Sequence, residues 1–423
     1  MLTLKMLRDD PEMVVGKLKI KNFDARPIVD KVLELDSLRR ALQTESDSIL
    51  AQQKQKAAEI GSLMKQGLKD QAEEAKKAVS DMKARSSELI ARMDAAGKEL
   101  EENLVLLPNI PCDLVKPGKG AEDNEIVKMG GPEVNLPENA LPHWELARKY
   151  DIIDFDLGVK ITGAGFPVYK GKGAKLQRAL INFFLDCNTA DGYKEVEPPV
   201  VVNRDSGFGT GQLPDKEGQM YHAEVDDFYL VPTAEVPVTN IFRDVILAAD
   251  QIPQRLTAYT PCFRREAGSY GKDVRGLNRL HQFDKVEIVR VEKPEDSYAA
   301  LDDMVAHVEA IVNKLGLKYR ILRLCGGDMS FTSAITYDFE LWSAAQQRWL
   351  EISSVSNFET YQANRLHLRY RDESGKTQLA HTLNGSSLAL PRVVAALLED
   401  NQTPEGIVIP EVLRPYTGFD IID

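Results

Sequence analysis

The stretch PCFRREAGSYGKDVRGLNRLHQFDKVEIVRV, residues 261–291, predicts two strands joined by a glycine-rich loop. Side chains alternate along the second strand, so Phe283, Lys285 and Glu287 share one face. With Arg264 at the end of the first strand, this pair of strands offers a floor for a nucleotide. A guanidinium suits a phosphate, an aromatic ring suits a base, and a carboxylate suits a cation or a donor. The alternative is an ordinary hairpin with a solvated, charged loop.

The loop between these strands is rich in glycine and basic residues: Gly268, Gly271, Lys272, Arg275, Gly276 and Arg279. The usual nucleotide loops are missing elsewhere. Gly171-Lys172-Gly173 does not fit the P-loop pattern, and no G-x-G-x-x-G opens a strand-helix-strand unit. A nucleotide site in this chain must therefore be built on a sheet with arginines.

Composition limits the classes of protein to be considered. The 423 residues allow two or three domains, and the formal net charge of -12 argues against general, sequence-blind nucleic-acid binding. The four cysteines are far apart and the six histidines are scattered, which disfavours zinc or disulfides and predicts a reducing cytoplasm. The first residues, MLTLKMLRDDPEM, lack the apolar core of a signal peptide, and no apolar run is long enough to span a bilayer.

Residues from about 27 to 106 predict a long antiparallel helical hairpin. Apolar residues recur at spacings of three, four and seven, which is typical of a coiled-coil seam. The predicted seam residues are Ile28, Val32, Leu35, Leu42, Ile49, Val79, Met82, Leu89, Met93, Ala96 and Leu100. Gly61 and Gly67 mark the turn, and lysines gather near it. Two interpretations remain open: an arm that binds nucleic acid, or a spacer or dimerisation coil.

Residues 108–142 are rich in proline and glycine and predict a linker. Beyond them the chain has mixed helical and strand patterns. We expect helices near 174–190, 295–315 and 388–398, a short strand at 228–231 and several strands between 319 and 371. The sequence GYKEVEPPVVV at 192–202 predicts a strand, and its proline pair indicates an edge or an interface.

Three stretches, in this order, resemble motifs 1, 2 and 3 of the class II aminoacyl-tRNA synthetases. They are GYKEVEPPVVV at 192–202, FRREAGSYGKDVRGLNRLHQFDKVE at 263–287 and NGSSLALPRVVAALLE at 384–399. Thr233-Ala234-Glu235, Glu351-Ile352-Ser353-Ser354, the closing IPEVLRPY and the amino-terminal hairpin are typical of the seryl branch. The chain therefore resembles a bacterial-type seryl-tRNA synthetase over essentially its whole length. It departs from the pattern at Glu197, at Arg265 and at Phe166-Pro167-Val168.

The resemblance implies an α+β fold: an antiparallel sheet of six or seven strands flanked by helices and preceded by the long coiled-coil hairpin. It implies a tRNA-binding arm at 1–107, a linker at 108–142 and a catalytic domain at 143–423 in a cytoplasmic homodimer. The implied reaction joins L-serine and ATP to seryl-adenylate and transfers the seryl group to serine tRNA, and also to selenocysteine tRNA. The arm would lie along the long variable stem of the tRNA.

Two alternatives are weighed against this. A paralogue that charges no tRNA, kept as a binding or regulatory module, should have lost Arg264, Glu287, Glu351 or Arg392, and all four are present. A threonyl or prolyl enzyme would not carry the amino-terminal arm.

The resemblance also implies the site residues. For ATP they are Arg264, Arg265, Glu266, Arg279, Leu280, Phe283, Glu351, Ile352, Ser353, Ser354 and Arg392, with Arg264 and Arg392 catalytic. For serine they are Thr233, Ala234, Glu235, Arg264, Glu287 and Ser386. Glu351 and Ser354 would hold Mg²⁺, which prefers oxygen ligands. No zinc is expected.

Individual roles follow from the same resemblance. Arg264 would bridge the α-phosphate and the serine carboxylate, and Arg279 would grip the pyrophosphate. Glu266 would read the adenine amino group, and Phe283 would stack on the base. Arg392 would take the other face of the adenine or the γ-phosphate. A site that hydrogen-bonds the serine hydroxyl would reject alanine by about 10⁴–10⁵.

Overall fold

The structure, a computed structural model, describes residues 1–136, 138–267 and 275–423. Of the loop positions named above, Gly268, Gly271 and Lys272 lie outside these described residues. The chain divides into two compact units, Met1–Pro108 and Asn109–Asp423. Among the described residues, none of the helices combines the length and the apolar character needed to cross a membrane.

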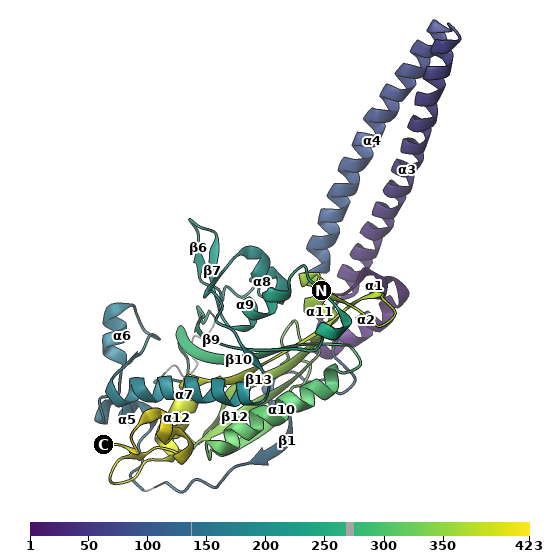
Figure 1. Ribbon diagram of the computed structural model, residues 1–423. Coiled ribbons are helices and arrows are strands. Elements are labelled where there is room, and N and C mark those ends of the chain that lie inside the picture. Colours follow the sequence, from purple (N-terminus) through teal and green to yellow (C-terminus); the bar gives the residue numbers. More distant parts are fainter. Residues whose placement is uncertain (137, 268–274) are drawn as a thin grey trace. The chain divides into compact units, whose positions relative to one another are not determined.

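The first unit is a hairpin of two long helices (Figure 1). Its elements are α1 (Leu4–Asp9), α2 (Pro11–Leu18), a 3-10 turn at Lys19–Lys21, α3 (Arg26–Lys65) and α4 (Lys69–Leu104). Asp10 caps α2 by accepting the Met13 N–H at 2.9 Å, and Pro11 stands where a helix needs no N–H donor. With 40 and 36 residues, α3 and α4 are about 60 and 54 Å long at 1.5 Å per residue.

The seam between α3 and α4 follows the predicted pattern in part. Buried seam residues are Val32, Leu35, Leu42, Leu89, Ala96 and Leu100, whereas Ile28, Ile49, Val79, Met82 and Met93 are only partly buried. Small residues that the apolar pattern did not single out are also buried: Ser46, Ala72, Ala75 and Ser86. Gly61 lies inside α3, so its assignment to the turn was wrong. The chain reverses beside Gly67, whose φ of 76° favours glycine.

The second unit is organised around an eight-stranded sheet with the order β1-β11-β12-β13-β16-β10-β9-β4. The strands are β1 (Glu125–Gly130), β4 (Lys194–Glu195), β9 (Gln254–Phe263), β10 (Gln282–Glu292), β11 (Tyr319–Arg323), β12 (Ile335–Ser343), β13 (Arg348–Glu359) and β16 (His381–Ala389). All neighbours pair antiparallel except β4 and β9, which are parallel. The predicted antiparallel sheet is confirmed, but it has eight strands and not the six or seven expected.

Helices flank this sheet, and in Figure 1 the three longest of this unit run along one side of it. They are α7 (Gly171–Ala190), α10 (Ser297–Lys314) and α12 (Leu390–Asp400). The shorter helices are α5 (His143–Lys149), α6 (Phe155–Ile161), α8 (Arg204–Thr210), α9 (Glu235–Thr239), α11 (Thr360–Leu366) and α13 (Arg414–Thr417). Helices α9 and α11 pack on β10 and β16 around a core that includes Val238, Val289 and Leu366.

Two two-stranded and two three-stranded sheets complete the described part of the unit. They are β2 (Ile153–Asp154) with β3 (Val168–Tyr169), β17 (Ile407–Val408) with β18 (Ile421–Ile422), β5 (Val201–Val202) with β7 (Phe228–Leu230) and β6 (His222–Ala223), and β8 (Ile246–Leu247) with β14 (Arg369–Arg371) and β15 (Thr377–Leu379).

Two expectations about local structure need correction. The linker expected at 108–142 contains β1, which pairs with β11 and forms one edge of the main sheet. The single strand expected at 192–202 is instead two short strands, β4 and β5, which join different sheets. Pro198 and Pro199 fall between them, because a proline has no N–H to give to a ladder. The expectation of an edge position holds for β4.

Candidate active site

A cavity of about 410 Å³ opens over β10, β13 and β16. It is lined by most of the predicted site residues: Thr233, Glu235, Arg264, Glu266, Arg279, Leu280, Phe283, Glu287, Glu351, Ile352, Ser353, Ser354, Ser386 and Arg392. The pairing of neighbouring strands brings them together although they are far apart in the sequence. Glu287 on β10, for example, lies opposite Ser386 on β16.

Two predicted residues are not among those that line the cavity. Arg265 is exposed, and its guanidinium carbon lies 5.9 Å from the centre of the Tyr221 ring. It follows Arg264 directly, and consecutive side chains of extended chain point in opposite directions. Ala234 is fully buried in the core beside α9. The side chains of Arg265 and Ala234 are therefore not placed for contact with a ligand in the cavity.

Arg264 is held against the wall of the cavity. Its guanidinium carbon lies 5.2 Å from the centre of the Phe283 ring, and its Nε donates to the Pro232 carbonyl at 3.2 Å. The backbone N–H of Arg264 also donates to the His281 carbonyl at 2.9 Å. These contacts restrict the arginine before any ligand arrives, which is the arrangement that favours charge stabilisation.

At the other end of the cavity, Glu287 is an acceptor with two neighbours. Lys285 Nζ lies 2.6 Å from its Oε2, and Thr233 Oγ1 donates to the same oxygen at 3.3 Å. The sequence pattern placed Lys285 on this face but assigned it no role. Two residues of opposite charge separated by one position on a strand were the available signal.

Glu235 lies beside this group. Gln362 Nε2 donates to Glu235 Oε1 at 2.6 Å, and Thr382 Oγ1 donates to Gln362 Oε1 at 2.7 Å. Burial, together with the nearby Glu287 carboxylate, raises the pKa of Glu235 to about 7. Gln362 was not predicted, and nothing in the local sequence marks it, because it reaches the site from α11.

Two further arginines of the cavity, Arg279 and Arg392, are held by hydrogen bonds. Arg279 Nη1 donates to Glu266 Oε2 at 2.7 Å. Arg392 Nε donates to the Asn278 carbonyl at 3.1 Å, and its Nη1 donates to the Glu351 carbonyl at 2.6 Å. Burial lowers the pKa of Arg392. The first turn of α12 is thereby tied to both the loop before β10 and the strand β13.

Oxygen atoms suited to a cation gather on β12 and β13. Ser354 Oγ donates to Glu351 Oε1 at 3.4 Å, and Asp338 stands opposite Ser354 in the strand register. Asp338 Oδ1 is buried with no hydrogen-bond partner, and burial and the Glu351 carboxylate raise the pKa of Asp338 well above its ordinary value. An all-oxygen set of this kind fits Mg²⁺. Within the described ranges, no three His, Cys, Asp or Glu residues are grouped to hold a metal by themselves.

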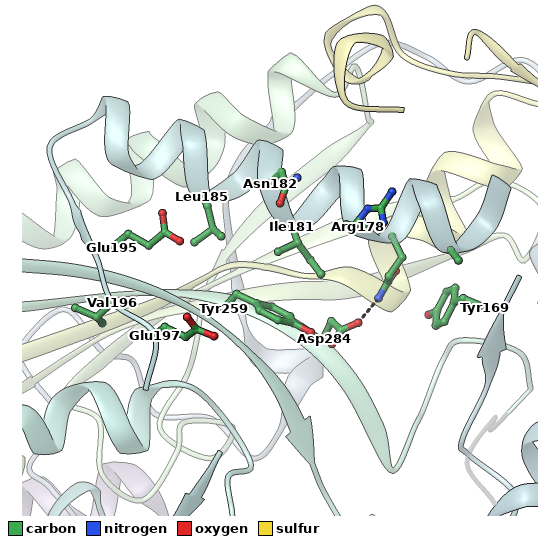
Figure 2. A pocket seen from close by; sticks show the side chains of 12 residues that line it. Tyr169, Arg178, Ile181, Asn182, Leu185, Glu195, Val196, Glu197, Tyr259 and Asp284 are labelled. Carbon is green, nitrogen blue, oxygen red and sulfur yellow. Dashed lines mark hydrogen bonds between the residues drawn. The ribbon is translucent and has the colours of Figure 1, made fainter. Parts of the chain in front are cut away.

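A second cavity, of about 610 Å³, lies between α7 and the strands β4, β9 and β10 (Figure 2). Figure 2 shows Arg178, Ile181 and Leu185 on α7 beside Tyr259 and Asp284 on the strands. Asp284 accepts hydrogen bonds from Gln177 Nε2 and from the Tyr259 hydroxyl, each at 2.8 Å. Because Asp284 lies between Phe283 and Lys285 on β10, its side chain faces the opposite side of the sheet from the candidate active site.

Comparison with known proteins gives a consistent result. Residues 1–111 match the family described as the seryl-tRNA synthetase N-terminal domain, and residues 219–401 match the tRNA synthetase class II core domain (G, H, P, S and T). The chain is 50% identical to the serine–tRNA ligase of Salinibacter ruber over 99% of this chain and 98% of that protein.

Solved structures agree. The seryl-tRNA synthetase of Pyrococcus horikoshii complexed with ATP is 32% identical and has a TM-score of 0.93, over 100% of this chain and 99% of that one. The seryl-tRNA synthetase of M. kandleri, in complex with A. aeolicus tRNASec, shares the fold at 17% identity and a TM-score of 0.58, over 80% and 69% of the two chains. The chain belongs to the seryl-tRNA synthetases of bacterial type, which are class II serine–tRNA ligases.

Proposed function

We propose that this chain joins L-serine to ATP as seryl-adenylate, releasing pyrophosphate, and then transfers the seryl group to serine tRNA. One observation carries the proposal. A single cavity is lined by the residues that the family resemblance assigns to serine, including Thr233 and Glu287, and by those that it assigns to ATP, including Arg264 and Arg392. Both substrates can therefore be held side by side, which is the main requirement of this reaction.

In the first step a serine carboxylate oxygen attacks the α-phosphorus, and the bond from that phosphorus to the bridging oxygen of pyrophosphate breaks. The nucleophile is already charged, so no general base is required. Arg264, which lines the cavity, would contact both reacting groups and neutralise charge. In the second step a ribose hydroxyl of the tRNA attacks the seryl carbonyl, AMP leaves, and the hydroxyl proton is released.

Selection of serine would rest on polar groups at the buried end of the cavity. The Glu287 carboxylate can accept from the serine ammonium and hydroxyl, and Ser386 lies opposite it on β16. Lys285 and Thr233 hold Glu287 in place through contacts of 2.6 and 3.3 Å. Alanine would leave such groups without partners, which is why a site of this kind rejects it.

Mg²⁺ fits the oxygen atoms described on β12 and β13. Glu351 and Ser354 would hold it, with Asp338 beside them. When bound, the ion would supply positive charge to the phosphates of ATP. Phosphate oxygens and water would complete its ligands, which is usual for Mg²⁺ bound with a nucleotide.

The helical hairpin is proposed to bind tRNA. Its lysines near the turn are exposed: Lys65, Lys69, Lys76 and Lys77. They suit contact with the phosphates of the long variable stem, a mode that reads shape and backbone rather than bases. Selenocysteine tRNA is proposed as a second substrate, and the M. kandleri complex with tRNASec supports that extension.

A homodimer in the cytoplasm is part of the same proposal. The short edge strand β4 and the helix α7 border the cavity in Figure 2, and β4 lies within the region 192–202 that resembles motif 1. A second copy seated there would cover a sheet edge that otherwise presents open backbone groups. The four cysteines are far apart in the sequence, a pattern that suits a reducing compartment.

ATP–pyrophosphate exchange, measured with each standard amino acid, tests the proposal. Serine alone should drive strong exchange, and removal of Mg²⁺ should abolish it. Equal exchange with threonine or alanine would contradict the serine site. Serine-dependent exchange without charging of serine tRNA would instead favour the paralogue that charges no tRNA.

A further inference from the structure

A buried histidine and a buried glutamate lie next to the candidate active site but are not among the residues that line it. His143 begins α5 and Glu399 lies near the end of α12. His143 Nδ1 is 2.8 Å from Glu399 Oε1, and both side chains are 0% exposed. The backbone N–H of His143 donates to the same oxygen at 3.0 Å. The pair was not singled out in the sequence.

The other ring nitrogen of His143 faces the loop before β10. The backbone N–H of Leu277 donates to His143 Nε2 at 2.9 Å. Since that N–H can only donate, Nε2 must be the acceptor. Nδ1 must then carry the ring proton, and this N–H donates a hydrogen bond to Glu399. The glutamate thus selects the form of the histidine that can hold the loop.

The same loop segment is held at two further points. Trp144, next to His143, lies under Arg275, with 4.9 Å between the guanidinium carbon and the ring centre. Gly276 has a φ of 59°, and a Cβ added there would lie 2.2 Å from His143 Nε2. Only glycine therefore lets the loop approach the ring this closely.

A closed set of contacts links the pair to the cavity. Asn278 Nδ2 donates to Gln346 Oε1 at 2.9 Å, and Gln346 Nε2 lies 3.3 Å from Glu399 Oε1. Glu399 Oε2 accepts from the Ser343 hydroxyl. From the loop, the Asn278 carbonyl accepts from Arg392 Nε at 3.1 Å. Leu277, Asn278 and Arg392 all line the cavity.

We propose that His143, oriented by Glu399, is a positioning residue for ATP: it holds loop residues 275–280 so that Arg279 and Arg392 are placed for the nucleotide. The proposal rests on the ATP site proposed above and adds a residue that touches no substrate. His143 contacts the loop that carries Arg279, a residue proposed for ATP, so its loss should affect ATP much more than serine.

Three substitutions test this by the KM values in serine-dependent exchange. His143→Asn keeps a donor toward Glu399 but loses the acceptor for Leu277, and the KM for ATP should rise about tenfold, the size expected for one lost hydrogen bond. His143→Gln places an amide oxygen near the position of Nε2, and the KM for ATP should rise less. Gly276→Ala should push the loop off the histidine and reproduce the effect of His143→Asn. In all three the KM for serine should change less than about twofold, well below the cost of a hydrogen bond.

His381→Asn is the matched control. His381 is also buried, and its Nδ1 lies 2.8 Å from Ser297 Oγ. Its loss should lower the thermal midpoint without changing the KM for ATP. If His143→Asn does not fold, Gly276→Ala provides the same test. An unchanged KM for ATP in the folded variants, a parallel rise for serine, or equal defects in His143→Asn and His143→Gln would overturn the proposal. Serine-dependent ATP–pyrophosphate exchange by the unsubstituted protein tests the proposed function separately from the role of His143.

Discussion

Lys285 Nζ and Glu287 Oε2 are 2.6 Å apart on the cavity face of β10, and their side chains are only 7% and 2% exposed. A buried ion pair contributes little net stability, because the cost of removing both charges from water offsets their attraction. The ion pair instead fixes the orientation of the Glu287 carboxylate. The lysine orients the Glu287 carboxylate that is proposed to accept from the serine ammonium, and Thr233 donates to the same oxygen at 3.3 Å.

Glu287→Gln should raise the KM for serine far more than the KM for ATP, because the amide keeps the volume but loses the charge. It should also destabilise the fold by about 3–5 kcal/mol, since Lys285 is left as an unpaired buried charge. ATP–pyrophosphate exchange and thermal unfolding measure the two effects.

The double variant Lys285→Met with Glu287→Gln is the control. It should recover most of the lost stability and none of the affinity for serine. Equal increases of KM for both substrates in the single variant would point to collapse of β10 rather than to a serine contact.

Arg264→Ala should reduce the rate of adenylate formation by about 10²–10³, by analogy with the removal of one preorganised donor to a developing charge. Arg265→Ala is the matched control, because Arg265 is exposed and does not line the cavity. Single-turnover measurements of adenylate formation at saturating serine and ATP compare the two variants. A near-normal rate in Arg264→Ala would limit that arginine to a structural role.

Glu235 predicts a pH dependence of stability. Its pKa is raised from an ordinary value of 4.5 to about 7 by burial and by the Glu287 carboxylate. The folded state therefore favours the protonated carboxyl of Glu235. The stability gained from this is fully present below pH 4.5 and is lost as the pH rises through about 7, because the carboxyl must then ionise in the fold. Each tenfold change in its acid dissociation constant corresponds to about 1.4 kcal/mol.

Glu235→Gln removes this ionisation. The thermal midpoint of the variant should therefore rise relative to that of the unsubstituted protein between pH 5 and pH 8. Calorimetry across this range measures the difference, and two parallel curves would show that Glu235 does not titrate there.

The arm should be needed for transfer of the seryl group to tRNA but not for formation of seryl-adenylate. Neutralising Lys65, Lys69, Lys76 and Lys77 should weaken charging of serine tRNA and leave serine-dependent exchange intact. Each lost phosphate contact should reduce the log–log salt slope of tRNA binding by roughly 0.7–0.9. Lys98→Gln, at an exposed position far along α4 from the turn, is the control. Deletion of residues 1–107 should have the same effect more strongly. Normal tRNA charging by the truncated protein would show that the arm is only a spacer.

Local periodicity was sufficient for much of the fold. The alternation along β10 placed Phe283, Lys285 and Glu287 on one face, and the spacing of apolar residues predicted the two long helices. The turn was misjudged at Gly61 because one glycine costs a helix only about 1 kcal/mol, which is less than the cost of interrupting a long packed helix. Buried small residues such as Ser86 left no apolar signal.

Tertiary structure alone decided which distant residues meet. Strand register sets Glu287 opposite Ser386 and Asp338 opposite Ser354, and the packing of α5 on α12 joins His143 to Glu399. Backbone hydrogen bonds between strands are nearly the same in every register, so they do not identify partners. The register is selected by the combined packing of all the side chains, and that sum cannot be read from any one stretch of sequence.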